Sequence, residues 1–95
     1  MKIYIAGKIT GDANYRKKFS EVAATYRSKG NIVLNPAVLP IGMTAADYMK
    51  ICLAMIDVSD AVVFLPDWIE SRGAAVELDY CNYVCKPVIV FDGKL

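Results

Sequence analysis

The stretch that decides the fold is Ala61-Val-Val-Phe-Leu65, an unbroken run of apolar residues that ends at Pro66. Such a run is typical of a strand in a parallel sheet that helices cover on both faces, because side chains on both sides must then be apolar. Three further short runs, rich in β-branched and aromatic residues, also predict strands. They lie at 2–6, 31–34 and 87–91.

Helical patterns separate the four predicted strands and are expected over residues 12–29, 44–58 and 71–84. In the first of them, apolar residues recur every three or four positions, and Gly30 stands at the C-cap position. The order β-α-β-α-β-α-β, with right-handed crossovers, predicts a three-layer α/β fold around a small parallel sheet, flavodoxin-like or Rossmann-like. We expect the strand order 2-1-3-4 in a single domain over residues 1–95.

The composition excludes several classes of function. The chain has 95 residues, a net charge of +1 and no histidine, so Ser-His-Asp triads and histidine-ligated metal sites are excluded. So small a net charge gives no field to hold a phosphate backbone, and we expect no nucleic-acid partner. No apolar run reaches the ~18–20 residues of a membrane span and no signal-peptide layout is present, which predicts a cytoplasmic protein without a membrane partner. The apolar share of 56% exceeds the usual ~45–50%, and a homo-oligomer interface is the first candidate for the surplus.

The three cysteines give little sign of a metal site. Cys52, Cys81 and Cys85 are odd in number and show no Cys-x-x-Cys spacing. Cys81 and Cys85 would share one helix face, but two thiols alone are a weak signal for a metal. We expect three reduced, buried thiols and no bound metal.

The predicted sheet places a ligand beyond the carboxyl ends of its strands, where the strand order reverses. That crevice would lie between the first and third strands, bordered by residues 7–11 and 66–73. In the first segment, glycines and a helix start favour an anion such as phosphate, although a plain tight turn explains the same residues. In the second, Ser71 is either a helix N-cap or a hydroxyl that holds phosphate or sugar, and Trp68 is either a base-stacking lid or a cap on the core.

Glu77 is the sharpest anomaly in the chain. At about 100° per residue, Asp79, Asn82 and Lys86 share one polar stripe of the third predicted helix, whereas Glu77 falls on nearly the opposite side. A carboxylate on the face that packs against the sheet costs several kcal/mol unless something compensates. It is either a functional carboxylate near the crevice or a helix-edge side chain that reaches solvent or pairs with Lys or Arg. Tyr4, in the first strand, is either core or part of the crevice mouth.

Three segments of the chain carry a family pattern: Tyr4-Ile-Ala-Gly7, Asp57-Val-Ser-Asp60-Ala-Val-Val and Ser71-Arg-Gly-Ala-Ala-Val-Glu77-Leu-Asp-Tyr80. Together they resemble the nucleoside 2-deoxyribosyltransferase superfamily over nearly the whole chain. The resemblance is closest to a compact branch of phage and bacterial proteins of unassigned function, which share the opening Tyr-Ile-Ala-Gly-Lys-Ile-Thr-Gly. It implies a nucleoside or nucleoside monophosphate as ligand and no cofactor.

By that resemblance, Glu77 falls on the nucleophile that attacks C1′ of a deoxynucleoside and holds the sugar as a covalent ester. A second base or water then takes the sugar. Tyr4 matches the tyrosine that orients this carboxylate. Ser71 matches a position that contacts the sugar in the transferases and the 5′-phosphate in the related deoxynucleoside-monophosphate glycosidases. With the loop residues above, the expected substrate-binding set is completed by Gly7, Lys8, Ile9, Thr10, Gly11, Trp68 and Gly73.

The chain departs from the family pattern at three points. Cys52 replaces an aspartate that helps protonate the leaving base, so Asp67 or another carboxylate would have to substitute as the acid. Position 79 is Asp79 where the family has glycine, and the sequence stops after the fourth strand, where relatives commonly add a fifth whose tail completes a neighbour's site. Three functions stay open: an enzyme that cleaves or exchanges the N-glycosidic bond, a non-catalytic nucleotide sensor or accessory protein, and a homo-oligomeric interaction module.

Overall fold

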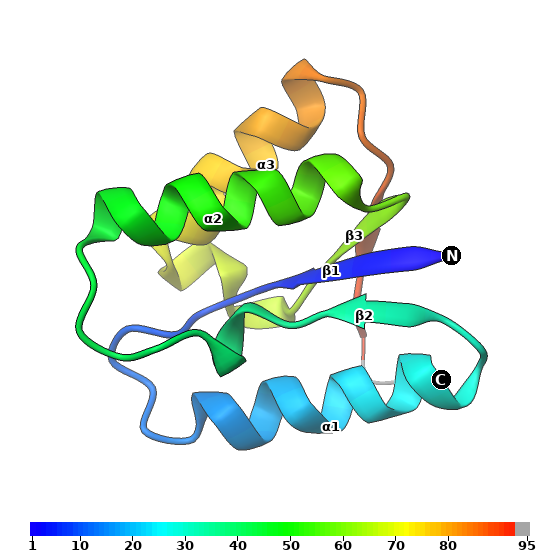
Figure 1. Cartoon of the computed structure of the whole chain (residues 1–95), viewed down its shortest axis with the longest axis horizontal. Coiled ribbons are helices and arrows are strands. Elements are labelled where there is room, and N and C mark those ends of the chain that lie inside the picture. Colours follow the sequence, from blue (N-terminus) through cyan, green and yellow to red (C-terminus); the bar gives the residue numbers. More distant parts are fainter. Residues whose placement is uncertain (93–95) are drawn as a thin grey trace.

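The computed structural model describes residues 1–92 and contains a sheet of four parallel strands (Figure 1). The strands are β1 (Lys2–Ala6), β2 (Ile32–Leu34), β3 (Ala61–Phe64) and β4 (Val88–Val90). They pair in the order β2-β1-β3-β4, which confirms the predicted sheet and its strand order. The order reverses between β1 and β3, so a ligand crevice is expected beyond the ends of these two strands.

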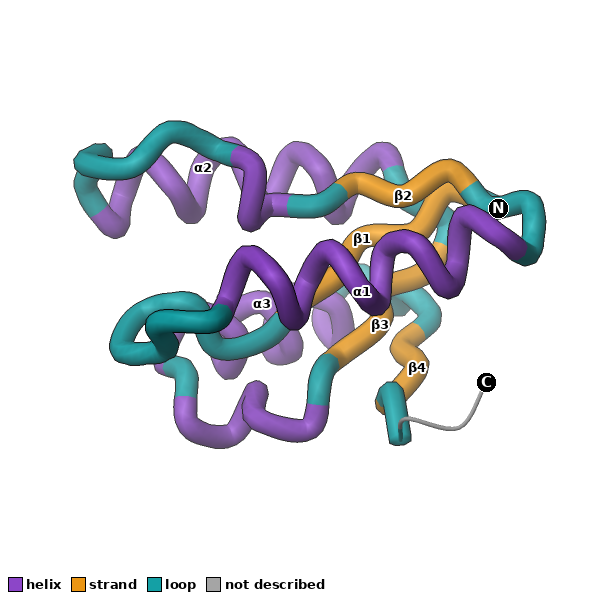
Figure 2. Tube along the Cα trace, turned by 90° about the horizontal axis from the view of Figure 1, so that it is seen from below, coloured by secondary structure: helices purple, strands orange, loops and turns teal. Residues whose placement is uncertain are grey.

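Three α-helices cover the two faces of the sheet unequally. They are α1 (Tyr15–Ser28), α2 (Ala45–Val58) and α3 (Arg72–Tyr83). Helix α1 lies alone on one face, whereas α2 and α3 lie together on the other (Figure 1, Figure 2). Side chains alternate along β1, so Ile3 and Ile5 join the core under α1, while Tyr4 and Ala6 join the core under α2 and α3. The predicted three-layer architecture is therefore confirmed.

Short 3₁₀ helices follow the second and third strands, where the sequence predicted irregular loops. They are η1 (Pro36–Val38) and η2 (Pro66–Glu70), and each begins with proline. Proline suits this position because its φ is already helical and its missing N–H would have no partner there. Both elements lie at the edge of the sheet where the crevice is expected.

The element boundaries differ from the prediction by a few residues, each for a local reason. Helix α1 begins at Tyr15 rather than at residue 12, because Asp12 Oδ1 accepts a hydrogen bond from the Asn14 N–H at 2.9 Å and closes a separate turn. Helix α2 begins one residue late because Thr44 is its N-cap, with Oγ1 accepting from the Asp47 N–H at 3.1 Å.

The expectation of three buried thiols is wrong at one position. Cys52 and Cys81 are buried and free, but Cys85 is exposed. Helix α3 ends at Tyr83, and Cys85 has a φ of +61°, so it does not continue the helix face that carries Cys81. The i, i+4 spacing of these cysteines therefore does not bring their thiols together on one helix.

Part of the apolar surplus lies on the outer surface of α2 and α3. Ile51 and Val58 on α2 and Val76 and Tyr83 on α3 are between 37% and 89% exposed. None of the helices within residues 1–92 combines the length and the apolar character needed to cross a membrane. The homo-oligomer that the composition suggested stays a prediction.

Candidate active site

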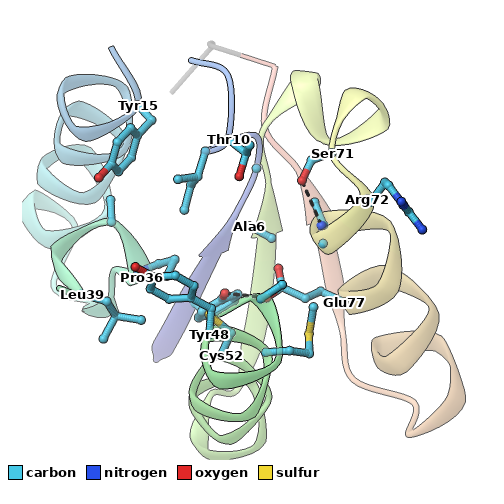
Figure 3. A pocket seen from close by; sticks show the side chains of 18 of the residues that line it. Ala6, Thr10, Tyr15, Pro36, Leu39, Tyr48, Cys52, Ser71, Arg72 and Glu77 are labelled. Carbon is cyan, nitrogen blue, oxygen red and sulfur yellow. Dashed lines mark hydrogen bonds between the residues drawn. The ribbon is translucent and has the colours of Figure 1, made fainter. Parts of the chain in front are cut away.

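A cavity of about 720 Å³ lies beyond the carboxyl ends of β1 and β3, on the side of the sheet that α2 and α3 cover (Figure 3). Its walls come from the end of β1 and the following loop, Tyr15 at the start of α1, the segment after β2, the first turns of α2, and the end of η2 with the start of α3. A volume of this size falls within the ~300–1,000 Å³ range of small-molecule sites. The cavity occupies the crevice that the sequence predicted at the switch point.

Glu77 and Tyr4 meet at the floor of this cavity. Glu77 Oε2 accepts a hydrogen bond from the Tyr4 hydroxyl at 2.8 Å, and the two side chains come from α3 and β1 (Figure 3). Glu77 is 6% exposed and Tyr4 only 1%. The helix-edge interpretation is therefore wrong: Glu77 is buried at the cavity floor, and within residues 1–92 no Lys or Arg side chain forms an ion pair with it. Tyr4 is both a core residue and the partner of Glu77, so its two interpretations hold together.

Burial controls the protonation of this cluster. It raises the pKa of Glu77 from its usual 4.5 to about 7, and hydrogen bonds from Tyr4 and Cys52 oppose part of that rise. Burial also raises the pKa of the Cys52 thiol to about 11. The pKa of Tyr4 lies well above its usual 10, because of burial and the neighbouring Glu77 charge. At neutral pH, Tyr4 and Cys52 are thus protonated, and Glu77 is the member of this cluster that changes charge.

Ser71 marks the polar end of the cavity. Its Oγ accepts a hydrogen bond from the Ala74 N–H at 3.1 Å, which confirms the N-cap interpretation. Ser71 also lines the cavity with Gly73, and Thr10 lies at the same end (Figure 3). Because the first N–H groups of a helix carry partial positive charge, this end of the cavity is suited to an anion.

The loop after β1 supplies part of the expected substrate-binding set. A Cβ on residue 7 would come within 2.9 Å of Leu65 Cδ1, so only glycine allows the loop to approach β3 this closely. The cavity-lining residues of this loop are Gly7, Ile9 and Thr10. Lys8 and Gly11 are not among the lining residues in the described part of the chain. Lys8 Nζ instead pairs with Glu70 Oε1 at 3.4 Å.

Asp67 and Trp68 lie in η2, outside the lining of the cavity as described for residues 1–92. Asp67 Oδ1 accepts a hydrogen bond from the Lys8 N–H at 3.0 Å, and Oδ2 accepts one from the Lys18 ammonium. Trp68 packs edge-on against Phe64, with ring centroids 6.2 Å apart, as a cap on the core. The structure therefore does not bring Asp67 to Glu77, nor Trp68 over the cavity as a lid.

One wall of the cavity was missed by the sequence reasoning. It is built from the segment after β2 and the first turns of α2, and its residues are Pro36, Ala37, Leu39, Ile41, Tyr48 and Met49. Tyr48 closes this wall, because its hydroxyl donates to the Pro40 carbonyl at 2.5 Å and accepts from the Met43 N–H at 3.3 Å. Since β2 lies beside β1, the loop after it had to reach the same edge of the sheet, and that adjacency could have revealed the wall.

The chemistry available in the cavity is that of a single buried carboxylate. Within residues 1–92, the carboxylates that line it are Glu77 and Glu70, and the Glu70 side chain is 61% exposed and paired with Lys8. Nowhere in the described part of the chain do three or more Cys, Asp or Glu side chains gather as a metal site would require. Glu77 can therefore act as a nucleophile or a base toward a ligand in the cavity.

Comparison with known proteins supports this architecture. The sequence model of a family described as "Domain of unknown function (DUF4406)" matches residues 1–90. None of the curated proteins compared with the chain matches its sequence.

Among solved structures, the fold is similar to a 2-deoxyribosyltransferase from the psychrotolerant bacterium Bacillus psychrosaccharolyticus. The TM-score is 0.77 at 24% identity, over 100% of this chain and 76% of that one. It is also similar to a 2-desoxiribosyltransferase from Leishmania mexicana, with a TM-score of 0.75 at 25% identity, over 95% of this chain and 63% of that one. The resemblance predicted from the sequence is thus confirmed at the level of the fold.

Proposed function

The chain belongs to the DUF4406 family, a domain of unknown function, and we propose that its cavity binds a nucleoside or nucleoside monophosphate with the sugar against Glu77. The observation that carries this proposal is the Glu77 carboxylate, buried at the cavity floor and held by the Tyr4 hydroxyl. Such a group costs stability, and a bound substrate is a reason for a protein to keep it. The similarity in fold to two 2-deoxyribosyltransferases supports the same choice of ligand.

The proposed reaction is cleavage or exchange of the N-glycosidic bond with retention at C1′. Ionised Glu77 attacks C1′, so a C1′–O ester bond forms while the C1′–N bond breaks, and the departing base keeps the bonding electron pair and takes a proton from solvent water. Water or a ring nitrogen of a second base then attacks C1′, the C1′–O ester bond breaks, and Glu77 recovers its negative charge while the attacking group gives its proton to solvent. Tyr4 holds the carboxylate in one orientation, which keeps the attacking oxygen aimed at the sugar.

The two ends of the cavity suit the two ends of such a ligand. The wall formed by Pro36, Leu39 and Tyr48 is apolar and matches the faces of a base, whereas Thr10 and Ser71 at the polar end match a 5′-hydroxyl or 5′-phosphate (Figure 3). In the same view, Glu77 lies below Ser71 and on the opposite side from Leu39. This arrangement supports a pose with the sugar beside Glu77, the base toward the apolar wall and the 5′ end toward Thr10 and Ser71.

A second candidate function, a non-catalytic nucleotide sensor or accessory protein, is favoured by one specific observation. The leaving base needs a proton donor, but Cys52 occupies the expected acid position and both oxygens of Asp67 are engaged by Lys8 and Lys18. A protein that kept the cavity without this acid would bind nucleotides and leave them intact.

Base release and ligand-induced thermal stabilisation, measured on the same samples, separate these functions. A panel of deoxynucleosides and their 5′-monophosphates is incubated with wild type, with Glu77→Gln, and with Asp79→Asn, an exposed carboxylate on the same helix. Release by wild type and Asp79→Asn, but not by Glu77→Gln, supports the enzyme. Stabilisation without release supports the sensor.

The absence of both effects would leave the third function, an interaction module that uses the exposed apolar side chains of α2 and α3. A homo-oligomer through that surface is compatible with all three functions. Measurement of the mass in solution for wild type and for Tyr83→Ser tests it, since Tyr83 is 89% exposed.

A further inference from the structure

Lys18 of α1 connects the two loops that border the polar end of the cavity, although it is not part of the lining described for residues 1–92. Its ammonium donates to the Lys8 carbonyl at 3.0 Å, to Asp12 Oδ2 at 2.6 Å, and to Asp67 Oδ2. An ammonium has three N–H donors, so these bonds use all of them. Lys18 therefore serves the loops themselves and has no donor left for the anion of a ligand.

Asp67 makes the same connection from the other side, in η2. Its Oδ1 accepts from the Lys8 N–H at 3.0 Å, while Oδ2 faces the ammonium of Lys18. The side chains of Lys18, Asp12 and Asp67 are only 23% to 27% exposed, so water shields their charges only in part. Burial alone would lower the pKa of Lys18, but the hydrogen bonds to Asp12 and Asp67 outweigh it and raise that pKa above its usual value. The Lys18 ammonium thus stays charged at neutral pH.

We propose that Lys18 and Asp67 are positioning residues, which fix the loop at 8–12 against η2 and thereby set the spacing between Thr10 and Ser71. The structural reason is continuity along the chain. The loop at 8–12 contains Thr10, and η2 ends at Glu70, directly before Ser71. We call the hydrogen bonds of Lys18 and Asp67 that join this loop to η2 the clasp. If the clasp opens, both residues at the polar end of the cavity lose their fixed separation. Only the identity of the ligand rests on the proposed function.

Hydrogen exchange tests the clasp without any ligand. In Lys18→Met, which keeps the length of the side chain and removes the charge, we expect amides of residues 8–12 to exchange at least about tenfold faster than in wild type. Lys17→Met removes the neighbouring, exposed lysine and should leave that exchange unchanged. Wild-type exchange rates in Lys18→Met would overturn the proposal.

Ligand affinity tests the consequence for the site. Asp67→Asn keeps an acceptor for the Lys8 N–H but loses the charge that faces Lys18. We expect each single variant to bind a deoxynucleoside 5′-monophosphate about tenfold more weakly than wild type, the scale of one charged hydrogen bond. Affinity for the matching deoxynucleoside should stay within about twofold, and the double variant should resemble the singles because the two residues act as one unit.

The outcomes distinguish this proposal from the proposed function. Equal losses for both ligands would indicate general loosening and overturn the positioning role. A wild type that binds neither ligand would overturn the proposed function, while the exchange rates of residues 8–12 would still decide the clasp.

Discussion

The two faces of the sheet bury different kinds of side chain. Under α1 the core is made of aliphatic and aromatic side chains, among them Phe19, the inward residues of β1 and β3, and Tyr26, and none of its buried members within residues 1–92 is a carboxylate. Under α2 and α3 the core also holds Tyr4, Cys52 and the Glu77 carboxylate, and a cavity opens beside them. One face thus consists of groups that favour burial, while the other includes a charge that opposes it.

The fold accommodates an unfavourable buried group on the face that also holds the cavity. Both faces gain folding free energy from buried apolar side chains, but only the face under α2 and α3 also keeps a buried carboxylate, which opposes folding. Local rules of packing are broken mainly where a protein has a function to perform. The comparison can be tested by changing each face separately, beginning with the change of largest expected effect.

The largest loss of stability is expected for Phe19→Ala on the apolar face. Phe19 is 0% exposed, and removing a buried phenyl ring costs about 4 kcal/mol of unfolding free energy because a cavity is left behind. Urea unfolding measures the loss, with Lys17→Ala, at an exposed position of the same helix, as the control that should change stability by less than about 0.5 kcal/mol. A loss below about 1 kcal/mol would show that this face does not dominate stability.

Glu77→Gln should have the opposite sign and stabilise the protein above neutral pH. Because the folded pKa of about 7 lies above the usual 4.5, ionisation of Glu77 opposes folding. That cost is absent below pH 4.5, grows between pH 4.5 and 7, and is constant above, where it amounts to about 3 kcal/mol. Unfolding of wild type and variant at pH 4 and pH 8 measures it. An equal difference at both pH values would contradict the burial of an ionisable carboxylate.

Tyr4→Phe sharpens the same comparison by removing one hydrogen bond and little volume. The variant leaves ionised Glu77 without the donor at 2.8 Å, so we expect a loss of about 2 kcal/mol at pH 8. Since that donor favours the charged form, the pKa of Glu77 should rise above its wild-type value. Carbon NMR titration of the glutamate side chains measures the change. A pKa that stays the same or falls would mean that Tyr4 does not hold the carboxylate.

Substitutions at Ser71 should have the smallest effect on stability and separate its two roles. Ser71→Ala removes the N-cap of α3 and should cost about 1 kcal/mol. Ser71→Asp keeps a capping oxygen and should preserve stability, but its charge should repel a 5′-phosphate from the polar end of the cavity. Thermal unfolding and monophosphate affinity measure the two effects. Undiminished monophosphate binding in Ser71→Asp would remove Ser71 from the phosphate end.

The sheet and the centre of the site were predictable because both depend on periodic patterns close in sequence. The run Ala61-Val-Val-Phe-Leu65 indicated a strand covered on both faces, and the helical repeat set Glu77 opposite the polar stripe of its helix. Both conclusions needed only the geometry of one element, which the sequence carries directly.

Other features depended on contacts between distant residues. Asp67 was expected to be an acid, but its carboxylate is held by Lys18, 49 positions away, and no local pattern indicates that pair. Cys85 is exposed because it lies after the end of α3 and itself adopts a left-handed backbone conformation. The i, i+4 spacing of the two cysteines does not reveal where the helix ends. Tyr48 closes a cavity wall because its hydroxyl donates to the Pro40 carbonyl, a contact between α2 and the preceding loop that no periodic pattern indicates.

The central claim, that the mixed face keeps Glu77 to attack a sugar, is tested most directly by mass spectrometry of the protein quenched during reaction with a deoxynucleoside or its 5′-monophosphate. We expect a deoxyribosyl group on the peptide that contains Glu77, sensitive to base, and absent from Glu77→Gln. Base released by wild type with no adduct on that peptide, together with equal release by Glu77→Gln, would contradict it.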